Sequence, residues 1–473
     1  MLRTLLCIIF LLGAGSSFCQ TDTLRLNLDE CIKIALENNL ELRRADLRAE
    51  TSERNLSNSR ANLLPSLNAR INGGVNNGRS IDPFTNTYIE EQLSFSNVGL
   101  SLGATVFNGL RLRNSILRDR YNLQASEMEV EEARQNLILD VTLAYLQALN
   151  NRDLVRLAEV RLETTSRQLD RLQDLYEEGS GNPAAYTDIL GQIANDRTAV
   201  VRAGNALTNA ILTLSQLLNV EQPVVPETLA REEIIVDYTF SPEEVYEQAL
   251  EGFPSIKARE LRIEAAKKNI NVARAFYFPE ISFFAQLNTN FSSAARFFTE
   301  TGTRVTETGG FVNLGDGTLP VFTNETIFER QEIGVYDQFS NNLNSVVGVA
   351  VDIPLFNGFR ARNNTALQKI VLEESKVELE NTRLIFRQSI QQAHADMQAA
   401  YREFHILQEQ LEAYRESFRI NEIRFNSGVS NIVEFIISKN NLDMAEINLA
   451  NAKYEYLLRV QVLDYFRGEG LTI

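Results

Sequence analysis

The sequence predicts a mostly α-helical protein with a few β-strands, built from two copies of one structural unit. Residues 26–65 and 240–279 align without a gap at an offset of 214. Further along the chain, Val106–Arg111 matches Leu355–Arg360 at an offset of 249. Each copy also contains a very long segment with helical periodicity and no proline. This duplication predicts one architecture made of two similar halves.

The first copy occupies residues 20–220 and opens with a short helix. Asn27 and Glu30 have the spacing of a capping box, in which each side chain binds the other residue's backbone N–H at a helix start. We then expect two strands, a long helix and a return helix, at residues 66–75, 97–107, 109–177 and 184–219.

The second copy occupies residues 240–473 and follows a linker at 221–239. It opens with the matching capping box, Ser241 and Glu244, and with Pro242 at the first helical position. Its strands are expected at 280–290 and 343–355, its long helix at 358–425 and its return helix at 431–467.

The predicted strands alternate between apolar and polar side chains with a period of two. In the second strand, Val98 and Leu100 face one way, whereas Gly99 and Ser101 face the other. The remaining strands repeat this pattern, with Phe284 as the clear exception on a polar face. Each strand therefore has one apolar face to bury and one small or polar face.

Such strands fit either the core of a soluble protein or the wall of an outer-membrane barrel, with apolar side chains toward lipid. The segments at 76–96 and 289–342 are long, polar and rich in Gly, Asn and Thr, like the outer loops of such barrels, which favours the second environment. Four strands cannot close a barrel, which needs at least about eight, and open edges are not tolerated in lipid. We therefore expect several chains to contribute strands to one barrel.

The long helices carry a coiled-coil pattern. Small and apolar residues recur in alternating steps of four and three from Phe386 to Phe418, and from Leu137 to Leu169 in the first copy. This 3.5-residue period predicts a left-handed coiled coil. At this length each helix would extend roughly 100 Å.

Residues 1–19 have the features of a secretory signal peptide, with a basic residue, an apolar core at Leu5–Leu12 and then small residues. We expect cleavage after Cys19, with lipid attachment at Cys19 as the alternative. Cys31 is then the one cysteine left, so no intramolecular disulfide can form. Its place on an apolar helix face predicts a buried thiol.

The charge balance bears on partners. The chain has 46 basic and 62 acidic residues, a net charge of −16, which argues against binding to nucleic acid. After the signal peptide no stretch approaches 18 consecutive apolar residues, so we expect no transmembrane helix. An exported, acidic chain of this kind is expected in the periplasm or in an outer-membrane barrel.

The sequence contains no recognisable catalytic or metal-binding constellation. His394 and His405 are eleven residues apart on one helix, about 16 Å along its axis, so they cannot share a metal within one chain. Asn313–Gly317 resembles an ion-binding loop but lacks the later ligands of an EF-hand, and turn chemistry is favoured. We expect neither an enzyme nor a cofactor.

With this duplication, the helix pattern of Leu26–Asn38, the Phe-Asn-Gly turns at 107–109 and 356–358 and the tip segments, the chain resembles the TolC family of outer-membrane channels. These are the exit ducts of tripartite efflux pumps and type I secretion systems. The resemblance covers nearly the whole mature chain. Residues 77–83 also resemble outer loops of Bacteroidetes members.

The resemblance implies a homotrimer in the outer membrane, in which three chains of four strands form a 12-stranded barrel. A helical barrel continues it into the periplasm, where a periplasmic adaptor protein and an inner-membrane transporter are the implied partners. The two helix–helix turns would form the periplasmic tip, where the channel narrows and the adaptor docks.

In the family a carboxylate just beyond each turn helps to form the constriction. The matching positions are Asp188 and Glu434, for which ordinary surface charge is the alternative reading. Some relatives carry a second acid where this chain has Ile437. The candidate adaptor contacts at the tips are Gly179, Gly181, Gly428, Val429 and Ser430.

The expected function is therefore a passive trimeric duct across the outer membrane and periplasm, gated at its periplasmic tip. The alternative is a soluble periplasmic coiled-coil scaffold without a pore. The sequence does not distinguish drugs, metals and proteins as cargo.

Overall fold

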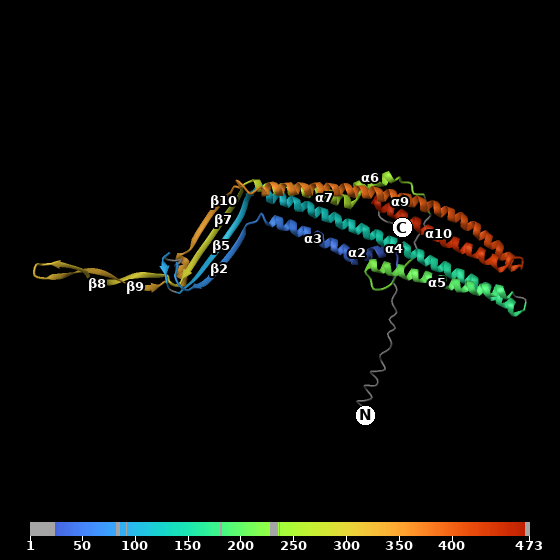
Figure 1. The fold of residues 1–473 in the computed structure, drawn as a ribbon, viewed down its shortest axis with the longest axis horizontal. Helices are drawn as coiled ribbons and strands as arrows, with labels where there is room; N and C mark the ends of the chain where they lie inside the picture. Colours follow the sequence, from blue (N-terminus) through green and yellow to red (C-terminus); the bar gives the residue numbers. More distant parts are fainter. Residues whose placement is uncertain are drawn as a thin grey trace, which may run out of the picture. The chain divides into compact units, whose positions relative to one another are not determined.

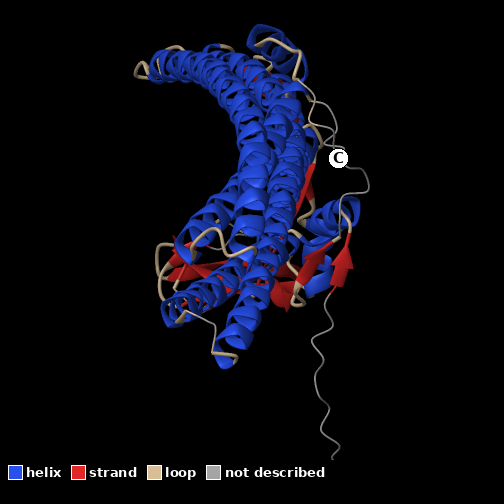
Figure 2. Ribbon diagram, turned by 90° about the vertical axis from the view of Figure 1, so that its right-hand side faces the viewer, coloured by secondary structure: helices blue, strands red, loops and turns tan. Residues whose placement is uncertain are grey.

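The computed structural model describes residues 24–81, 86–90, 92–179, 182–227, 235 and 237–468. The predicted signal peptide, Cys19 and Gly181 lie outside these residues. The chain divides into two compact units. We call residues 1–54, 120–265 and 372–473 the helical unit, and residues 55–119 and 266–371 the strand unit. Helices account for most of the described residues (Figure 2).

Among the described residues, eight helices of 11 residues or more belong wholly or partly to the helical unit: α2 Leu28–Asn38, α3 Leu40–Ala61, α4 Arg111–Glu177, α5 Pro183–Leu218, α6 Pro242–Gly252, α7 Pro254–Arg274, α9 Arg360–Asn426 and α10 Ile432–Arg467. Of these, α3, α4, α7 and α9 extend into the strand unit. A short parallel pair joins β1 (Leu24–Leu26) to β6 (Val224–Pro226). No helix among the described residues is both long and apolar enough to cross a membrane.

Both predicted capping boxes are present. At the start of α2 the Asn27 side chain accepts from Glu30 N at 2.9 Å, and the Glu30 carboxylate accepts from Asn27 N at 2.9 Å. At α6 the same exchange joins Ser241 and Glu244. Each box satisfies backbone donors that a helix start otherwise leaves unpaired.

Helices α4 and α9 begin at Arg111 and Arg360, two residues after the predicted starts, because two left-handed residues precede each of them. Gly109 and Leu110 have φ of +65° and +64°, and Gly358 and Phe359 have φ of +62° and +61°. The predicted coiled-coil seam is buried in part: Val141, Ile390 and Met397 are each at most 1 % exposed, whereas Leu162 and Phe404 are half-buried.

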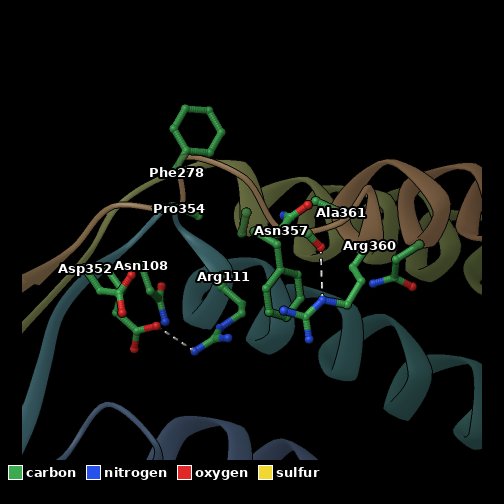
Figure 3. A pocket seen from close by; sticks show the side chains of 12 residues that line it. Asn108, Arg111, Phe278, Asp352, Pro354, Asn357, Arg360 and Ala361 are labelled. Carbon is green, nitrogen blue, oxygen red and sulfur yellow. Dashed lines mark hydrogen bonds and ion pairs between the residues drawn. The ribbon is translucent and has the colours of Figure 1, made fainter.

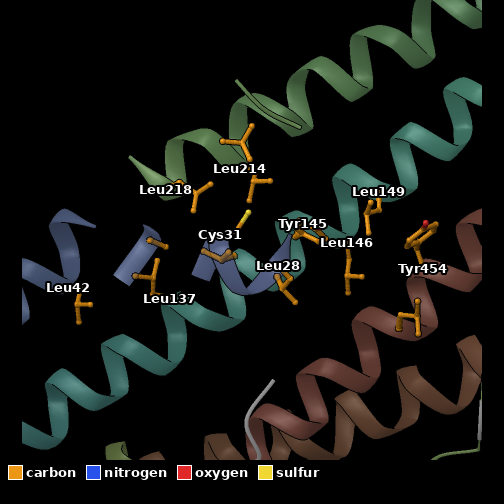
Figure 4. Close-up of a cluster of buried hydrophobic side chains, with 14 residues drawn as sticks. Leu28, Cys31, Leu42, Leu137, Tyr145, Leu146, Leu149, Leu214, Leu218 and Tyr454 are labelled. Atoms are coloured by element: carbon orange, nitrogen blue, oxygen red, sulfur yellow. The ribbon is translucent and has the colours of Figure 1, made fainter. Parts of the chain in front are cut away.

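Within the described part of the helical unit, an extensive apolar cluster joins α2, α3, α4, α5 and α10 (Figure 4). Cys31 of α2 is fully buried there among Tyr145, Leu214 and Leu218, which confirms the predicted buried thiol. Burial, aided by the neighbouring Glu30, raises the pKa of Cys31 to about 12. The thiol therefore stays protonated and acts as a small apolar side chain.

The strand unit is built on a four-stranded antiparallel sheet (Figure 1). Its strands are β2 Ser66–Asn76, β5 Leu93–Asn108, β7 Glu280–Ser292 and β10 Asn344–Asp352, in the order β10-β7-β5-β2. The central pair, β5 and β7, thus comes from different copies of the repeat, and β2 and β10 form the two edges. A small pair, β3 (Ser80–Ile81) and β4 (Tyr88–Ile89), lies between β2 and β5 in sequence.

Two strand ends differ from the prediction. Strand β5 begins at Leu93, not at residue 97, because it pairs with β2 from Leu93 and with β7 from Phe95. Strand β10 ends at Asp352, not at residue 355. It has only β7 as a neighbour among the described strands, and Pro354 has no N–H to donate to a ladder.

The register places the predicted apolar residues on one continuous face. Ile71 lies opposite Val98, Leu100 opposite Leu287, and Phe283 opposite Val349. Such side chains remain exposed, with Ile71 at 73 % and Val349 at 61 %. An exposed apolar face across all four strands requires lipid or another protein to cover it.

The exceptional Phe284 has a local explanation. It lies opposite Gly348 of β10, and a Cβ atom added at Gly348 would approach the Phe284 ring to 2.7 Å. The ring therefore covers a position without a side chain, as aromatic residues do beside glycines in sheets.

The prediction of one long loop at 289–342 was wrong. The segment contains the end of β7, a hairpin of β8 (Arg296–Asn313) and β9 (Thr318–Glu332), and the short helix α8 (Val335–Asn341). The hairpin is exposed on both faces, so its sequence lacks the apolar alternation that identified the other strands. Asn313–Gly317 contains its turn, as predicted, with Leu314 N bound to Gly317 O at 2.9 Å.

Candidate gate at the helix tips

Each long helix is joined to its return helix by a short turn, and an asparagine begins each return helix. The Asn182 side chain accepts from Ala184 N at 3.0 Å at the start of α5. The Asn431 side chain accepts from Glu434 N at 2.9 Å at the start of α10. Both caps fix where the chain reverses, and thereby where the two predicted gate residues lie.

The Glu434 carboxylate is held by its own turn. It accepts from Ser430 Oγ at 2.6 Å and from Asn431 Nδ2 at 3.4 Å. Arg424 at the end of α9 lies 4.0 Å from it. A carboxylate in the first turn of a helix is also favoured by the helix dipole. Glu434 therefore stabilises the turn whatever else it does.

Asp188 lies on the exposed side of α5, next to the buried Ile189. It forms no ion pair with any residue that the structure describes. The two predicted gate carboxylates are thus both exposed, but only Glu434 is fixed by local hydrogen bonds. They form no hydrogen bond with each other.

An apolar cluster packs the two tips together. Leu172 of α4 and Ala185 and Ile189 of α5 meet Ile432 and Phe435 of α10. Ile189 directly follows Asp188, and Phe435 directly follows Glu434. The cluster therefore couples the positions of the two predicted gate residues through their neighbours in sequence.

A hydrogen bond from Arg171 reinforces this contact. Its guanidinium donates to the backbone oxygen of Asn426 at 2.8 Å and also to the side-chain oxygen of that residue. Asn426 is the last residue of α9, where carbonyl oxygens lack helical partners. Arg171 of the first copy thus caps the long helix of the second.

The candidate adaptor contacts lie in the turns themselves. Gly179 and Gly428 have φ of +76° and +73°, a region that side-chain-bearing residues rarely occupy. Val429 is 70 % exposed, and Ser430 is half-buried and bound to Glu434. Gly181 is outside the described residues.

A buried ionic cluster, which the sequence analysis missed, connects the same helices farther from the turns. It consists of Arg161 on α4, Asp196 on α5, and Lys439 and Asp443 on α10. Arg161 Nε lies 2.6 Å from Asp196 and 3.1 Å from Asp443. Lys439 Nζ lies 2.6 Å from Asp443 and 3.4 Å from Asp196. The Asp196 and Lys439 side chains are 0 % and 1 % exposed.

Polar neighbours complete the cluster. Thr165 Oγ1 donates to Asp196, and Gln192 Nε2 donates to the same carboxylate at 2.9 Å. Asn440 Oδ1 accepts from Arg161 at 3.2 Å. Burial raises the pKa of Asp443, and the charges of Lys439 and Arg161 oppose that rise. Two cations balance two carboxylates, so all four can remain charged while buried.

The polar face of the strand unit's sheet is lined mainly by amide side chains. They come from all four strands, and one hollow is lined by polar residues that include Asn68, Arg70, Asn72, Asn97, Ser101, Gln286, Asn288, Asn290 and Asn344. Amides hydrogen-bond to water through both donors and acceptors without adding charge. Such a surface suits the wall of a water-filled passage.

The described residues contain no group of three or more His, Cys, Asp or Glu side chains able to hold a metal ion. His394 Nε2 lies 3.2 Å from the Phe240 carbonyl, and His405 packs edge-on against Tyr401 at 4.5 Å between ring centroids. Both histidines therefore have structural contacts in the helical unit.

Comparison with known proteins places these features in a family. Residues 31–220 and 245–468 match the family described as outer membrane efflux protein, one stretch in each copy of the repeat. The chain is 25 % identical over 444 residues to the probable outer membrane lipoprotein SilC of Salmonella typhimurium, covering 92 % of this chain and 84 % of that protein. It is 21 % identical over 450 residues to the outer membrane protein TolC of Escherichia coli, covering 94 % and 82 %.

Solved structures show the same fold. The chain resembles CusC with a TM-score of 0.74 at 19 % identity, over 95 % of this chain and 94 % of that one. It resembles the outer-membrane channel OprN with a TM-score of 0.71 at 18 % identity, over 94 % and 90 %. The chain therefore has a TolC-like fold and belongs to the family of outer membrane efflux proteins, the TolC-type channels of the outer membrane.

Proposed function

We propose that three copies of this chain form a passive exit duct for an efflux pump or a type I secretion system. Family membership implies a trimeric efflux channel, and the finer assembly is our proposal. Three four-stranded sheets would make a 12-stranded barrel in the outer membrane, and the long helices would continue it through the periplasm. A periplasmic adaptor and an inner-membrane transporter would supply cargo and open the duct.

The observation that carries this proposal is the sheet of the strand unit. It has an exposed apolar face, an amide-lined polar face and two free edges. Lipid would cover the first face, water the second, and neighbouring copies the edges. A soluble coiled-coil scaffold, the alternative, leaves all three features without a role.

Membrane extraction distinguishes the two functions. The duct is expected to stay in outer membranes during a carbonate wash and to migrate as a heat-resistant oligomer on gels. A scaffold would be released by carbonate. Purified material that is monomeric in detergent and forms no conductance in planar bilayers would refute the duct.

We further propose that Asp188 and Glu434 line the constriction at the periplasmic end. Three-fold symmetry would turn each residue into a ring of carboxylates that attracts cations. The apolar tip cluster supports this proposal because it couples both residues to the contact between the two tips. Opening would untwist the coiled-coil pairs near the tips, and the turns at Gly179, Gly181 and Gly428–Ser430 would contact the adaptor.

The likeness of residues 77–83 to outer loops of Bacteroidetes members supports a proposal of lineage only. The relatives described above come from Salmonella and Escherichia and do not support it. The cargo is set largely by the inner-membrane transporter, so identification of that partner would define it.

A further inference from the structure

Among the described strands, the four-stranded sheet has two free edges: β2, the first strand of the first copy's pair, and β10, the last strand of the second copy's pair. Since neighbouring strands alternate in direction in the order β10-β7-β5-β2, β10 runs antiparallel to β2. The β10 edge of one chain can therefore pair with the β2 edge of another. The internal duplication predicts the register of that pairing.

The pairing of β5 with β7 is a template for it. Strand β5 ends the first copy's pair of strands, as β10 ends the second, with an offset of 249. Strand β7 begins the second copy's pair, as β2 begins the first, with an offset of 214. The β5–β7 ladder inside the chain thus corresponds to a β10–β2 ladder between chains.

Transferring the register gives specific neighbours. Leu102 lies opposite Ala285 inside the chain, and this pair corresponds to Val351 opposite Ile71. Both residues belong to the apolar face. The adjoining pair inside the chain is Gly103 with Phe284.

That adjoining pair corresponds to Asp352 opposite Arg70. Neither side chain forms an ion pair with any residue that the structure describes, and both belong to the polar face. Opposite charges directly across a ladder stabilise it, whereas any shift of register by one residue would move them to opposite faces. Charge complementarity therefore selects the same register as the duplication.

The strand–helix junction gives independent support (Figure 3). Inside the chain, Gly109 packs so closely that an added Cβ would lie 2.8 Å from both Ala275 O and Phe278 Cβ. Gly358, its equivalent, has the same left-handed backbone, but a Cβ added there would lie within 4 Å of no atom of the described residues beyond its two chain neighbours. The first junction, at Gly109, is thus covered by Ala275 and Phe278, whereas the second, at Gly358, has no such covering residues within the described part of the chain.

The missing partner is available on the β2 side of another chain. Ala61 and Leu64 are the equivalents of Ala275 and Phe278, and they form the same turn. Leu64 N binds Ala61 O at 2.9 Å, as Phe278 N binds Ala275 O at 3.0 Å.

Exposure and strand length agree with this account. Phe356 is 77 % exposed, whereas its equivalent Phe107, which pairs with β7, is 37 % exposed. The early end of β10 at Asp352 is also explained, because residues beyond it lack the partner that extends β5 to Asn108.

We propose that adjacent chains join through a β10–β2 ladder in which Val351 faces Ile71, Asp352 pairs with Arg70, and Ala61 and Leu64 cover Gly358. This interface rests on the proposed trimer and specifies which surfaces meet. It uses a second copy of the chain as the partner of an otherwise incomplete junction.

Disulfide trapping tests the register. In the variant I71C/V351C the two cysteines would lie opposite each other on adjacent antiparallel strands of two chains. Such residues have Cα atoms about 4.5–5.5 Å apart, a spacing that allows a disulfide. Within one chain the two positions lie on opposite edges of a four-stranded sheet, so they can form a disulfide only between two chains. With a membrane-permeant oxidant we expect nearly complete conversion to covalent trimer.

The matched control is A69C/V351C, which is displaced by two residues along β2 and should give only background linkage. The heat-resistant oligomer is measured for both variants. If that oligomer forms but the control pair links as well as or better than I71C/V351C, the register is wrong. If no oligomer forms in any variant or in the unmodified protein, the proposed trimer itself fails.

A charge exchange provides a second readout. R70D and D352R should each lower the temperature at which the oligomer dissociates, and the double variant should recover most of the loss. Equal loss in the double variant and the single variants, with the oligomer still formed, would overturn the Asp352–Arg70 pairing.

Discussion

The exposed carboxylates at the tips and the buried charges farther along the same helices contrast sharply. Asp188 and Glu434 are in solvent, where removal of a charge leaves water in its place. Asp196 and Lys439 are excluded from water and satisfied only by one another and by their neighbours. In the proposed gate the exposed acids would act on ions, whereas the buried cluster joins helices of the two hairpins.

Breaking the buried cluster should have the largest effect. Lys439→Met removes one of the two ammonium or guanidinium charges and leaves Arg161 to balance both the Asp196 and Asp443 carboxylates. A buried ion pair that loses one partner is destabilised by about 3–5 kcal/mol. Thermal unfolding followed by helical circular dichroism measures this loss. The control Lys376→Met removes an exposed partner of Glu373 and should change stability by about 0–1 kcal/mol. Equal effects of the two substitutions would contradict the role given to the cluster.

Removing the cap at either tip should have a smaller, local effect. Asn431→Ala and Asn182→Ala each delete a side chain that accepts from a backbone N–H, at a cost of about 1 kcal/mol. Hydrogen exchange of the Glu434 and Ala184 amides should accelerate accordingly in the respective variants. Unchanged exchange at these amides would show that the caps do not control the turns.

Neutralising the exposed acids should change ion permeation more than stability. In the double variant Asp188→Ala and Glu434→Ala we expect higher conductance and a cation preference reduced about threefold in planar bilayers, because two rings of negative charge are lost. Glu373→Ala, about 80 Å from the second tip along α9, serves as the control. Conductance and selectivity unchanged in the double variant would remove both residues from the gate.

The smallest effect concerns pH. Since burial raises the pKa of Asp443 above its unfolded value of 3.8, the folded chain binds this proton more tightly than the unfolded chain. The contribution of Asp443 to stability is therefore fully present below that value and is lost as pH rises through the raised pKa. Asp443→Asn should flatten the part of the stability profile that lies above about pH 4. An unchanged slope would show that Asp443 does not titrate in this range.

The sequence predicted features that repeat with a period. Apolar alternation identified the four strands of the sheet, and steps of four and three identified the seams that include Val141 and Met397. The hairpin β8–β9 escaped because both of its faces are exposed, so no apolar period marks it. Its β-branched and aromatic content was the signal that could have revealed it.

The buried cluster escaped for a different reason. Arg161, Asp196, Lys439 and Asp443 are of the kinds usually found on surfaces, and only the i, i+4 spacing of the last two suggested a pair. Their burial depends on three helices meeting, which no local pattern encodes. The predicted gate residues came from family likeness alone, and the structure adds their local contacts.

Strand edges that remain open in the single chain bear on how the protein is made. A single subunit has unpaired backbone N–H and C=O groups on its edge strands, and no strand of the same sheet can pair with them. Assembly therefore depends on encounters between subunits. The yield of assembled oligomer should therefore rise steeply with expression level. Periplasmic chaperones that cover the edge strands would reduce aggregation until the oligomer has formed.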